Sequence, residues 1–383
     1  MRRICVLINN TGLGGAERRL GRLFAKRADT DPGTCLVVNR GLWLQLQAAG
    51  LVRGGEPRVW CLAEPWGALV SWLGLQTGAV RFWLKKLDYV LFACLLLGRY
   101  GMASRRQFHA VLGGTYVMLP LMLTRRDHAY AISVTNRNLA MMVGVSWALP
   151  MYRFALRRCH AIDALSVGVR EDLIERGIPP EKILASPGSV VNLDHFSPSR
   201  EKDPWVVFAG RLVEEKNPLL FLEAIPAIRA EVPAARFFVL GEGPLRSDIE
   251  KTLDRLNLRD AVDASFRDDP APVFRRARVF VSLQRQDNYP SQSLLEAMAS
   301  GTVPVATDVG LTWQLVDETT GLRVKPDPGE IAVAVTRLLK DPSACERLGR
   351  AARQRVAERH SEDTYRTHLD LLYRSLTQRG GVT

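Results

Sequence analysis

The stretch Trp205–Pro218, which reads WVVFAGRLVEEKNP, decides the fold of this chain. Its first five residues, Trp205–Ala209, are apolar and favour extended structure, which predicts a short buried strand. A turn that opens with Gly210 follows the strand. The next stretch, Pro218–Glu231, has helical spacing of its apolar residues, with proline in the first turn where a helix tolerates it. A strand, a turn and a helix in this order form the repeating unit of a parallel α/β sheet.

The same unit recurs along the chain in both directions from this stretch. Further strands are predicted at Arg3–Ile8, Cys35–Val38, Arg58–Leu62, His109–Leu112, Tyr130–Val134, Ala161–Ser166, Arg236–Leu240, Val279–Leu283 and Val303–Ala306. Helices are predicted at Ala16–Ala28, within Trp66–Arg99, and at Leu245–Leu256, Gln292–Ser300, Gly329–Leu339, Ser343–His360 and Glu362–Leu376. The alternation predicts an α/β protein with parallel sheets.

The amino-acid composition changes between Ser186 and Pro204, where prolines, a glycine and a run of charged residues predict a linker. The length of 383 residues allows two or three domains. We therefore expect two doubly wound, Rossmann-like domains at residues 1–190 and 204–361, with a C-terminal helix at 362–383 packing back on the first. Such domains bind ligands at the carboxyl ends of their strands.

The net charge is 52 − 40 = +12, and it is unevenly distributed. Residues 1–200 hold 26 Lys/Arg and 13 Asp/Glu, a net of +13, whereas residues 201–383 hold 26 and 27, a net of −1. The halves are therefore expected to face different partners. An apolar content of 47% excludes a disordered chain, and six dispersed cysteines argue against a disulfide framework or a metal cluster. No apolar run reaches the ~18 residues of a membrane span.

Two cations follow the strand in the opening stretch. Arg211 stands at the strand end and Lys216 just before the helix, so both would suit an anionic phosphate or diphosphate. The alternative is a solvated turn in which Glu214 and Glu215 neutralise both cations. Gly243 follows the next strand, where it allows close approach of a backbone or simply forms a tight turn.

The stretch from Asp287 to Gly301 carries the strongest signal. Ser291 is suited to cap a short helix that Gly301 ends, and free N–H groups at that helix N-terminus suit an anion, with Ser293 in the first turn. Glu296, in the second turn, would accept hydrogen bonds from sugar hydroxyls, or is an ordinary exposed helix glutamate.

Taken in order, these stretches resemble the family 4 (group 1) glycosyltransferases. The matching pieces are Gly14-Gly15-Ala16-Glu17, Gly210–Pro218, Leu240–Arg246, Pro290–Gly301 and Asp308-Val309-Gly310. The resemblance implies the GT-B fold, with two Rossmann-like domains facing each other across a cleft, and a retaining transfer from a nucleotide-sugar donor. It implies a saccharide or lipid-linked saccharide acceptor and a role in cell-surface polysaccharide, lipopolysaccharide or glycolipid synthesis.

The resemblance also implies roles for single residues. Arg211 and Lys216 would hold the donor diphosphate and Glu296 the nucleotide ribose, with Gly243 and Ser293 beside the donor. Gly14 and Gly15 would let the first domain's loop approach the donor. Asn288 stands where the family has its first glutamate, so the contact to the sugar falls to Asp287, one residue earlier, or is altered.

On the acceptor side, the family has two histidines that flank one residue. Here His109 matches the first and Val111 replaces the second, so His109 is either an acceptor-side residue or a structural strand histidine. No metal and no cofactor are implied. The D-x-D sequence Asp29-Thr30-Asp31 lies in a polar turn after a helix rather than at a strand end, which argues against a metal-dependent GT-A enzyme.

Six of the eight tryptophans lie in the first 147 residues. Apolar stretches of the same region are interrupted by pairs of basic residues, Lys85-Lys86, Arg105-Arg106 and Arg125-Arg126. This pattern predicts a cytoplasmic protein that attaches peripherally to an anionic membrane, or a buried helix pair with solvated basic edges. Nucleic acid is not expected as a partner, because no binding motif accompanies the charge.

Two other classes of protein compete with the glycosyltransferase. A catalytically degenerate sugar-nucleotide-binding protein would account for Asn288 and Val111. A dehydrogenase would need the third glycine of GxGxxG, and Glu17 occupies that position.

Overall fold

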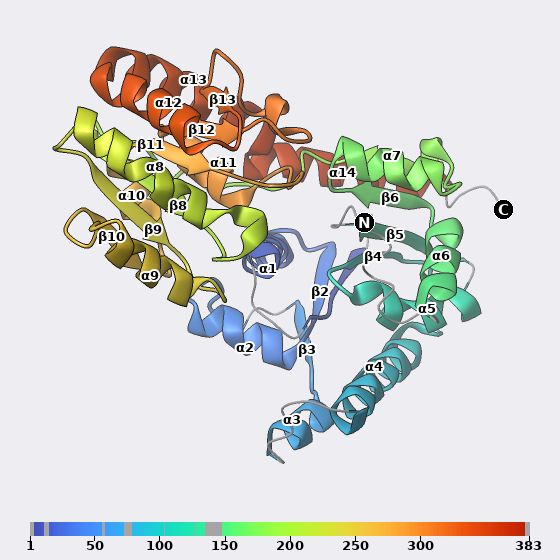
Figure 1. Ribbon diagram of the computed structural model, residues 1–383. Helices are drawn as coiled ribbons and strands as arrows, with labels where there is room; N and C mark the ends of the chain where they lie inside the picture. Colours follow the sequence, from blue (N-terminus) through green and yellow to red (C-terminus); the bar gives the residue numbers. More distant parts are fainter. Residues whose placement is uncertain are drawn as a thin grey trace. The chain divides into compact units, whose positions relative to one another are not determined.

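The computed structural model describes residues 4–10, 15–55, 58–72, 79–102, 104–125, 127–134 and 148–379. These residues form two compact units (Figure 1), Met1–Gly188 with Arg366–Thr383, and Ser189–Tyr365. Each unit is built around a parallel sheet, as the alternation of strands and helices in the sequence predicts.

The described residues of the first unit form a seven-stranded sheet in the order β3-β2-β1-β4-β5-β6-β7. Its strands are β1 (Ile4–Ile8), β2 (Thr34–Asn39), β3 (Val59–Leu62), β4 (Gln107–Val111), β5 (Ala129–Val134), β6 (Ala161–Ala164) and β7 (Ile183–Ala185). Its helices are α1 (Gly15–Thr30), α2 (Arg40–Ala48), α3 (Pro65–Trp72), α4 (Ala79–Tyr100), α5 (Gly114–Thr124), α6 (Ala148–Arg158) and α7 (Val167–Glu175).

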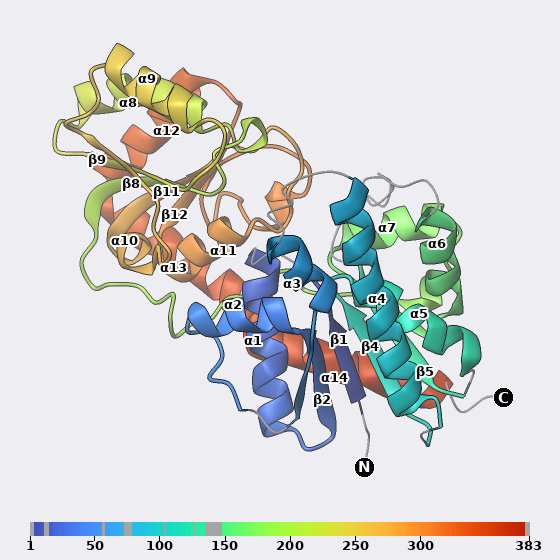
Figure 2. The same cartoon turned by 90° about the horizontal axis from the view of Figure 1, so that it is seen from below.

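The central strands of this sheet are buried along their whole length, because helices cover both faces. Neighbouring residues of β4 point to opposite faces. Phe108 joins the core under α4 and α5, and His109 faces Phe24 of α1 and Tyr373 of the C-terminal helix α14 (Glu362–Arg379). Figure 2 shows α1 and α14 on one side of the sheet and α4 and α5 on the other.

The second unit contains a six-stranded sheet in the order β10-β9-β8-β11-β12-β13. Its strands are β8 (Asp203–Ala209), β9 (Arg236–Leu240), β10 (Val262–Ser265), β11 (Ala277–Ser282), β12 (Val303–Thr307) and β13 (Leu322–Val324). Its helices are α8 (Pro218–Glu231), α9 (Arg246–Arg255), α10 (Ala271–Arg276), α11 (Gln292–Ala299), α12 (Pro328–Lys340) and α13 (Pro342–His360). Apolar residues of α8, α9 and α12 pack on one face of the sheet, and those of α10, α11 and α13 pack on the other (Figure 2).

Local chemistry explains where two helices of this unit begin. Asp327 and Asp341 each precede a proline and accept a hydrogen bond from a backbone N–H of the first turn, at 2.9 Å in both cases. The aspartate satisfies an N–H that the helix leaves unpaired, and the proline has none to satisfy. The start of α8 differs, because Pro218 follows Asn217, which has a left-handed backbone.

The stretch Ser186–Pro204, predicted as a linker, belongs largely to the second unit. Val191 forms a β-bridge with Ser361, and Phe196 is buried with its ring 6.3 Å from that of Phe274. Arg353 of α13 donates a hydrogen bond to the carbonyl oxygen of Phe196 at 2.8 Å. Prolines and charges indicate a linker in sequence, but a buried aromatic side chain and paired backbone groups hold this segment on the unit.

Candidate donor-binding site of the second unit

The loop that follows β8 presents two neighbouring cations. Arg211 is exposed, and Lys216 is half-buried at the end of a 3-10 turn, η3 (Glu214–Lys216). Burial, followed by the nearby positive charge of Arg211, lowers the pKa of Lys216 from 10.5 to about 8. The loop therefore holds two like charges close together, at a cost that a bound anion would relieve.

Glu214 does not neutralise these cations. Its Oε2 atom lies 3.7 Å from Nη1 of Arg285, which follows β11. The negative charge of Glu215 raises the pKa of Lys216, but by less than burial and Arg211 lower it. Within the part of the chain that the structure describes, neither the Arg211 nor the Lys216 side chain has a hydrogen bond or an ion pair. The two glutamates therefore do not neutralise the cations, and the anion site stays a prediction.

Backbone hydrogen bonds fix this loop against its neighbours at the carboxyl edge of the sheet. Leu212 donates its N–H to the carbonyl oxygen of Glu242 in the loop after β9, at 2.8 Å. Gly243 lies so close that a Cβ atom there would be 2.5 Å from the carbonyl oxygen of Leu212. The sequence left open whether Gly243 serves a close approach or only a turn, and the structure places it at a close approach of two loops.

The loop after β11 is tied in the same way. Arg285 donates its N–H to the carbonyl oxygen of Glu215 at 3.0 Å. Oδ1 of Asp287 accepts N–H groups from Tyr289 and from Leu311, the latter in the loop after β12, both at 3.2 Å. The carboxylate thus joins two loops, whereas Asn288 is exposed. Asp287 as the residue that contacts the donor sugar stays a prediction.

Helix α11 begins at the same edge with incomplete capping. Ser291 takes the N-cap position, as predicted, but its side chain makes no capping hydrogen bond, and its buried Oγ atom has no partner among the described residues. The N–H groups of Ser293 and Leu294, in the first turn, likewise have no acceptor in the described residues. An uncapped helix N-terminus attracts anions through these N–H groups and the helix dipole.

Glu296 lies one turn further along α11 and is half-buried. Its Oε1 atom accepts a hydrogen bond from Nε2 of Gln292 at 2.8 Å, and Gln292 also donates to the carbonyl oxygen of Val190 at 3.2 Å. Gln292 thus orients the Glu296 carboxylate. The ordinary exposed helix glutamate is not what the structure contains.

In the first unit, His109 lies in the core. Its Nδ1 atom is 2.9 Å from the hydroxyl of Tyr373 in α14, and its Nε2 atom is 2.8 Å from Oγ of Ser133. Ser133 donates to Asp163 at 2.7 Å, and Asp163 pairs with His368 of α14 at 2.8 Å. This network anchors α14 to the sheet.

Burial lowers the pKa of His109 to about 4, so the imidazole is neutral at pH 7. With its side chain fully buried, direct contact with an acceptor is not available in this structure, which speaks for the structural interpretation of this histidine. Of the two glycines predicted near the donor, Gly15 begins α1 and Gly14 lies outside the described residues.

The D-x-D sequence lies at the end of α1 rather than in a turn beyond it, because Asp29 and Thr30 belong to the last turn of the helix and Asp31 follows it directly. Oδ1 of Asp31 accepts the N–H of Gly33 at 2.9 Å, and Oδ2 accepts the hydroxyl of Thr34 at 2.7 Å. Within the described ranges no group of three or more His, Cys, Asp or Glu side chains is placed to hold a metal ion.

Two parallel doubly wound sheets, one in each unit, define the GT-B fold. The crystal structure of Anabaena Alr3699/HepE in complex with UDP matches with a TM-score of 0.74 at 14% identity, covering 97% of this chain and 100% of that chain. A family model described as glycosyl transferases group 1 matches residues 192–355. The matched residues lie within the second unit, so the similarity to this family is shown for that unit.

Two curated relatives are named as glycosyltransferases. An alpha-D-kanosaminyltransferase of Streptomyces kanamyceticus is 28% identical over 241 residues, which is 58% of this chain and 62% of that enzyme. An alpha-1,4-N-acetyl-D-galactosaminyltransferase of Campylobacter jejuni, whose name includes a PP-undecaprenol-linked saccharide, is 28% identical over 217 residues, 54% of this chain and 59% of that enzyme. The chain thus spans about three fifths of the length of these two relatives.

Proposed function

We propose that this protein is a retaining glycosyltransferase that moves a sugar from a nucleotide-sugar donor to a saccharide or lipid-linked saccharide. Its proposed place is the synthesis of a cell-surface polysaccharide, a lipopolysaccharide or a glycolipid. The observation that carries the proposal is the pair of unneutralised cations, Arg211 and Lys216, at the sheet edge where α11 also begins uncapped. The UDP complex of the Anabaena protein and the undecaprenol-linked saccharide in the name of the Campylobacter enzyme support the donor and acceptor classes.

The proposed chemistry depends on stabilising the leaving group. As the bond from the sugar to the diphosphate breaks, negative charge grows on the diphosphate, and preorganised cations and N–H groups lower the energy of that state. Arg211, Lys216 and the first turn of α11 would supply this stabilisation, and Glu296 would accept hydrogen bonds from the ribose. Asp287 would contact the donor sugar. The acceptor hydroxyl would attack from the face that the leaving group departs from and pass its proton to the phosphate.

Nucleotide binding is the direct test of the donor site. Calorimetry with UDP, GDP and ADP should show one tight ligand, and Arg211→Ala should weaken it by a charge-assisted hydrogen bond, about 1.5–3 kcal/mol. Arg255→Ala, which removes a surface ion pair with Glu223 in the same unit, is the matched control. Equal affinity in the wild type and Arg211→Ala would refute the assignment.

Transfer itself separates the enzyme from a catalytically degenerate binding protein. Incubation with the preferred nucleotide sugar should release nucleoside diphosphate, onto water or onto a lipid-linked acceptor, with the anomeric configuration retained. Binding without any release would support the degenerate protein. We also propose that turnover needs no metal, so activity that EDTA abolishes and magnesium or manganese restores would overturn that part.

We propose that the protein is cytoplasmic and that an anionic membrane is a partner of the first unit. Helix α4 buries Phe92 and Leu96 in the core but exposes Leu87 and Val90, the latter by 58%, on its other side. Trp72, at the end of α3, is 81% exposed. The net charge of +13 in residues 1–200 complements an anionic surface. Each basic residue near such a surface contributes about 1 kcal/mol to binding. No helix in the described part of the chain has the length and hydropathy to span a bilayer.

Vesicle sedimentation tests this partner. The protein should pellet with phosphatidylserine-containing vesicles at low salt, and less at high salt or with phosphatidylcholine alone. Leu87→Gln with Val90→Gln should reduce binding without changing charge. Val333→Gln, at a 72% exposed position of α12 in the other unit, should not. Equal binding to anionic and neutral vesicles would contradict the proposal. The side chains of Lys85 and Lys86 lie outside the described residues.

A further inference from the structure

Cys5 and Cys35 form a pair of thiols in the first unit. They are paired in register on the neighbouring parallel strands β1 and β2, so both side chains point to the same face of the sheet. Cys5 belongs to the core under α4, and Cys35 packs against it. The hydroxyl of Tyr100, the last residue of α4, lies 3.9 Å from each sulfur atom. The two thiols are therefore neighbours around a common hydroxyl group.

The spacing of this pair suits a disulfide. Neighbouring strands of a sheet lie about 4.8 Å apart, and the Cα atoms of residues in register have about this separation. The Cα atoms of a disulfide lie roughly 4.4–6.8 Å apart. Both cysteines are free thiols in this structure. A bond between their Sγ atoms therefore needs no movement of either strand.

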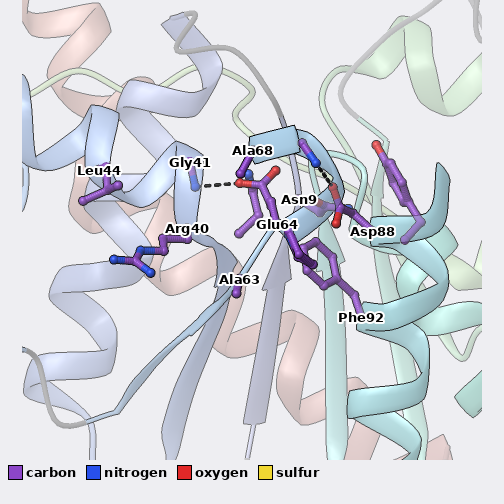
Figure 3. A pocket seen from close by; sticks show the side chains of 13 residues that line it. Asn9, Arg40, Gly41, Leu44, Ala63, Glu64, Ala68, Asp88 and Phe92 are labelled. Atoms are coloured by element: carbon purple, nitrogen blue, oxygen red, sulfur yellow. Dashed lines mark hydrogen bonds between the residues drawn. The ribbon is translucent and has the colours of Figure 1, made fainter. Parts of the chain in front are cut away.

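The pair lies at the amino edge of the sheet, because each cysteine is the second residue of its strand. A pocket of this unit lies at the opposite, carboxyl edge, where Asn9, Glu64 and Asp88 are among the residues that line it (Figure 3). Neither thiol lines this pocket. The chemistry of the thiols is therefore separate from the edge at which such sheets bind their ligands.

The surroundings of Cys35 favour its thiolate form. Hydrogen bonding with the Cys5 thiol lowers the pKa of Cys35, and burial raises it. The hydroxyl of Tyr100 and the guanidinium groups of Arg99 and Arg106 lower it further. The Cζ atoms of the two arginines lie 5.8 and 5.2 Å from the centroid of the Tyr100 ring, and neither arginine has an ion pair among the described residues. Cations without a carboxylate partner stabilise a thiolate, which is the nucleophilic form of cysteine.

The two thiols differ in exposure and in protonation. Cys5 is 2% exposed, whereas Cys35 is half-buried. Hydrogen bonding with Cys35 and burial raise the pKa of Cys5, so this thiol keeps its proton. An oxidant from solvent therefore meets the Cys35 thiolate first, with the Cys5 thiol behind it.

The other two buried cysteines have different surroundings. Cys159 and Cys345 each donate a hydrogen bond to a backbone carbonyl oxygen, that of Leu156 and that of Leu338, at 3.0 Å. Burial raises the pKa of Cys159 to about 12 and that of Cys345 to about 11. Core packing accounts for these two cysteines, but it does not account for the cations gathered beside Cys35.

We propose that Cys35 and Cys5 form a site of reversible oxidation by hydrogen peroxide. The Cys35 thiolate attacks one peroxide oxygen, the O–O bond breaks, and the sulfur becomes a sulfenic acid while the other oxygen leaves as hydroxide and takes up a proton. The Cys5 thiol then gives up its proton and attacks the sulfenic sulfur, so an S–S bond forms and the hydroxyl group leaves as water. The two sulfur atoms lose two electrons, and the peroxide is reduced to two water molecules. A dithiol restores both thiols by exchange.

Peptide mapping of the full chain after treatment with hydrogen peroxide tests the proposal. We expect a disulfide between Cys5 and Cys35 that dithiothreitol reverses. Cys5→Ser removes the second thiol, so the sulfenic acid of Cys35 should persist and react with dimedone. Cys94→Ser, which removes an exposed cysteine of α4, is the matched control and should form the disulfide as the wild type does.

Two further measurements test whether the surroundings are built for this reaction. Arg99→Gln removes an exposed cation beside Cys35 and should slow disulfide formation several-fold without changing the product. The oxidised wild type should unfold a few degrees above the reduced protein, because the bond constrains the unfolded chain and the folded strands already fit it.

Several outcomes overturn the proposal: no disulfide between Cys5 and Cys35, oxidation that dithiothreitol does not reverse, or a sulfenic acid that forms faster on Cys94 than on Cys35. A lower unfolding temperature after oxidation would mean that the strands must distort, and it would overturn the proposal as well. The mapping and the unfolding use the wild type, so misfolding of Cys5→Ser leaves the test decisive.

Discussion

Replacing Lys216 with Met is expected to make the protein more stable and its donor binding weaker. The folded protein holds the pKa of Lys216 at about 8, below its usual 10.5, mainly through burial. The unfolded chain therefore binds the proton of Lys216 more tightly than the folded protein does. As a result, the charged lysine lowers the free energy of unfolding at every pH below about 8. This destabilisation declines between pH 8 and pH 10.5 and is absent above pH 10.5.

The magnitude follows from the size of this pKa difference. A difference of about 2.5 at 1.36 kcal/mol for each pKa unit gives roughly 3.4 kcal/mol as an upper limit. Lys216 is partly exposed, so solvent screening reduces this to about 1–2 kcal/mol. Met keeps the apolar stem of the side chain, so the packing contribution is largely preserved. Lys216→Met should therefore raise the free energy of unfolding by about 1–2 kcal/mol at pH 7 and leave it unchanged near pH 11.

Donor binding should change in the opposite direction. Loss of a charge-assisted hydrogen bond to the diphosphate is expected to weaken nucleotide affinity by about 1.5–3 kcal/mol, roughly 10- to 150-fold. In the wild type, a bound diphosphate raises the pKa of Lys216, so binding takes up a proton near pH 8 and affinity falls as pH rises above 8.

Urea unfolding at pH 7 and pH 11, and calorimetry with the preferred nucleoside diphosphate from pH 7 to 9.5, measure both effects. Lys251→Met replaces an exposed lysine of the same unit and should leave stability and affinity unchanged. A Lys216→Met protein that is less stable at pH 7 and binds the nucleotide as tightly as the wild type would refute the reasoning.

Three further predictions concern other residues. Glu296→Gln should stay folded, as thermal unfolding would show, and bind nucleotide several-fold more weakly in calorimetry; a protein that fails to fold would assign Glu296 a structural role. Gly243→Ala should cost about 1–3 kcal/mol in urea unfolding, because its Cβ would crowd Leu212; unchanged stability would contradict the close approach. The pKa of His109 is about 4, below its value in the unfolded chain, and the groups around its imidazole are Asp163, His368, Arg27 and Tyr373. The free energy of unfolding should therefore fall as pH drops from 7 towards 4. His109→Gln should show a shallower fall, and an equal slope would exclude His109 as its source.

The sequence was sufficient for much of the local structure. Helix α8 and strand β9 match their predicted bounds, and β1 and α11 differ by one residue, because each has an unbroken apolar pattern between clear turn signals. The sequence did not reveal the edge strands β10 and β13, which have only four and three residues. Segments this short carry no periodicity, and pairing with β9 and β12 makes them strands.

The sequence by itself also determined which side chains follow which strands, and so placed Arg211, Lys216, Gly243 and Glu296 at one edge of the second sheet. That inference is local, because parallel strands end at a common edge whatever their order.

Only the tertiary structure decided the electrostatic state of these groups. Glu214 pairs with Arg285 rather than with the cations beside it in sequence, and His109 is buried against Tyr373. In the same way, β2 and β4 flank β1, at whose end Asn9 is buried, and its Nδ2 atom has no hydrogen-bond partner among the described residues. Burial and charge pairing are set by residues distant in the chain, and these two effects govern whether a polar group is neutralised, anchored in a core, or left available to a ligand.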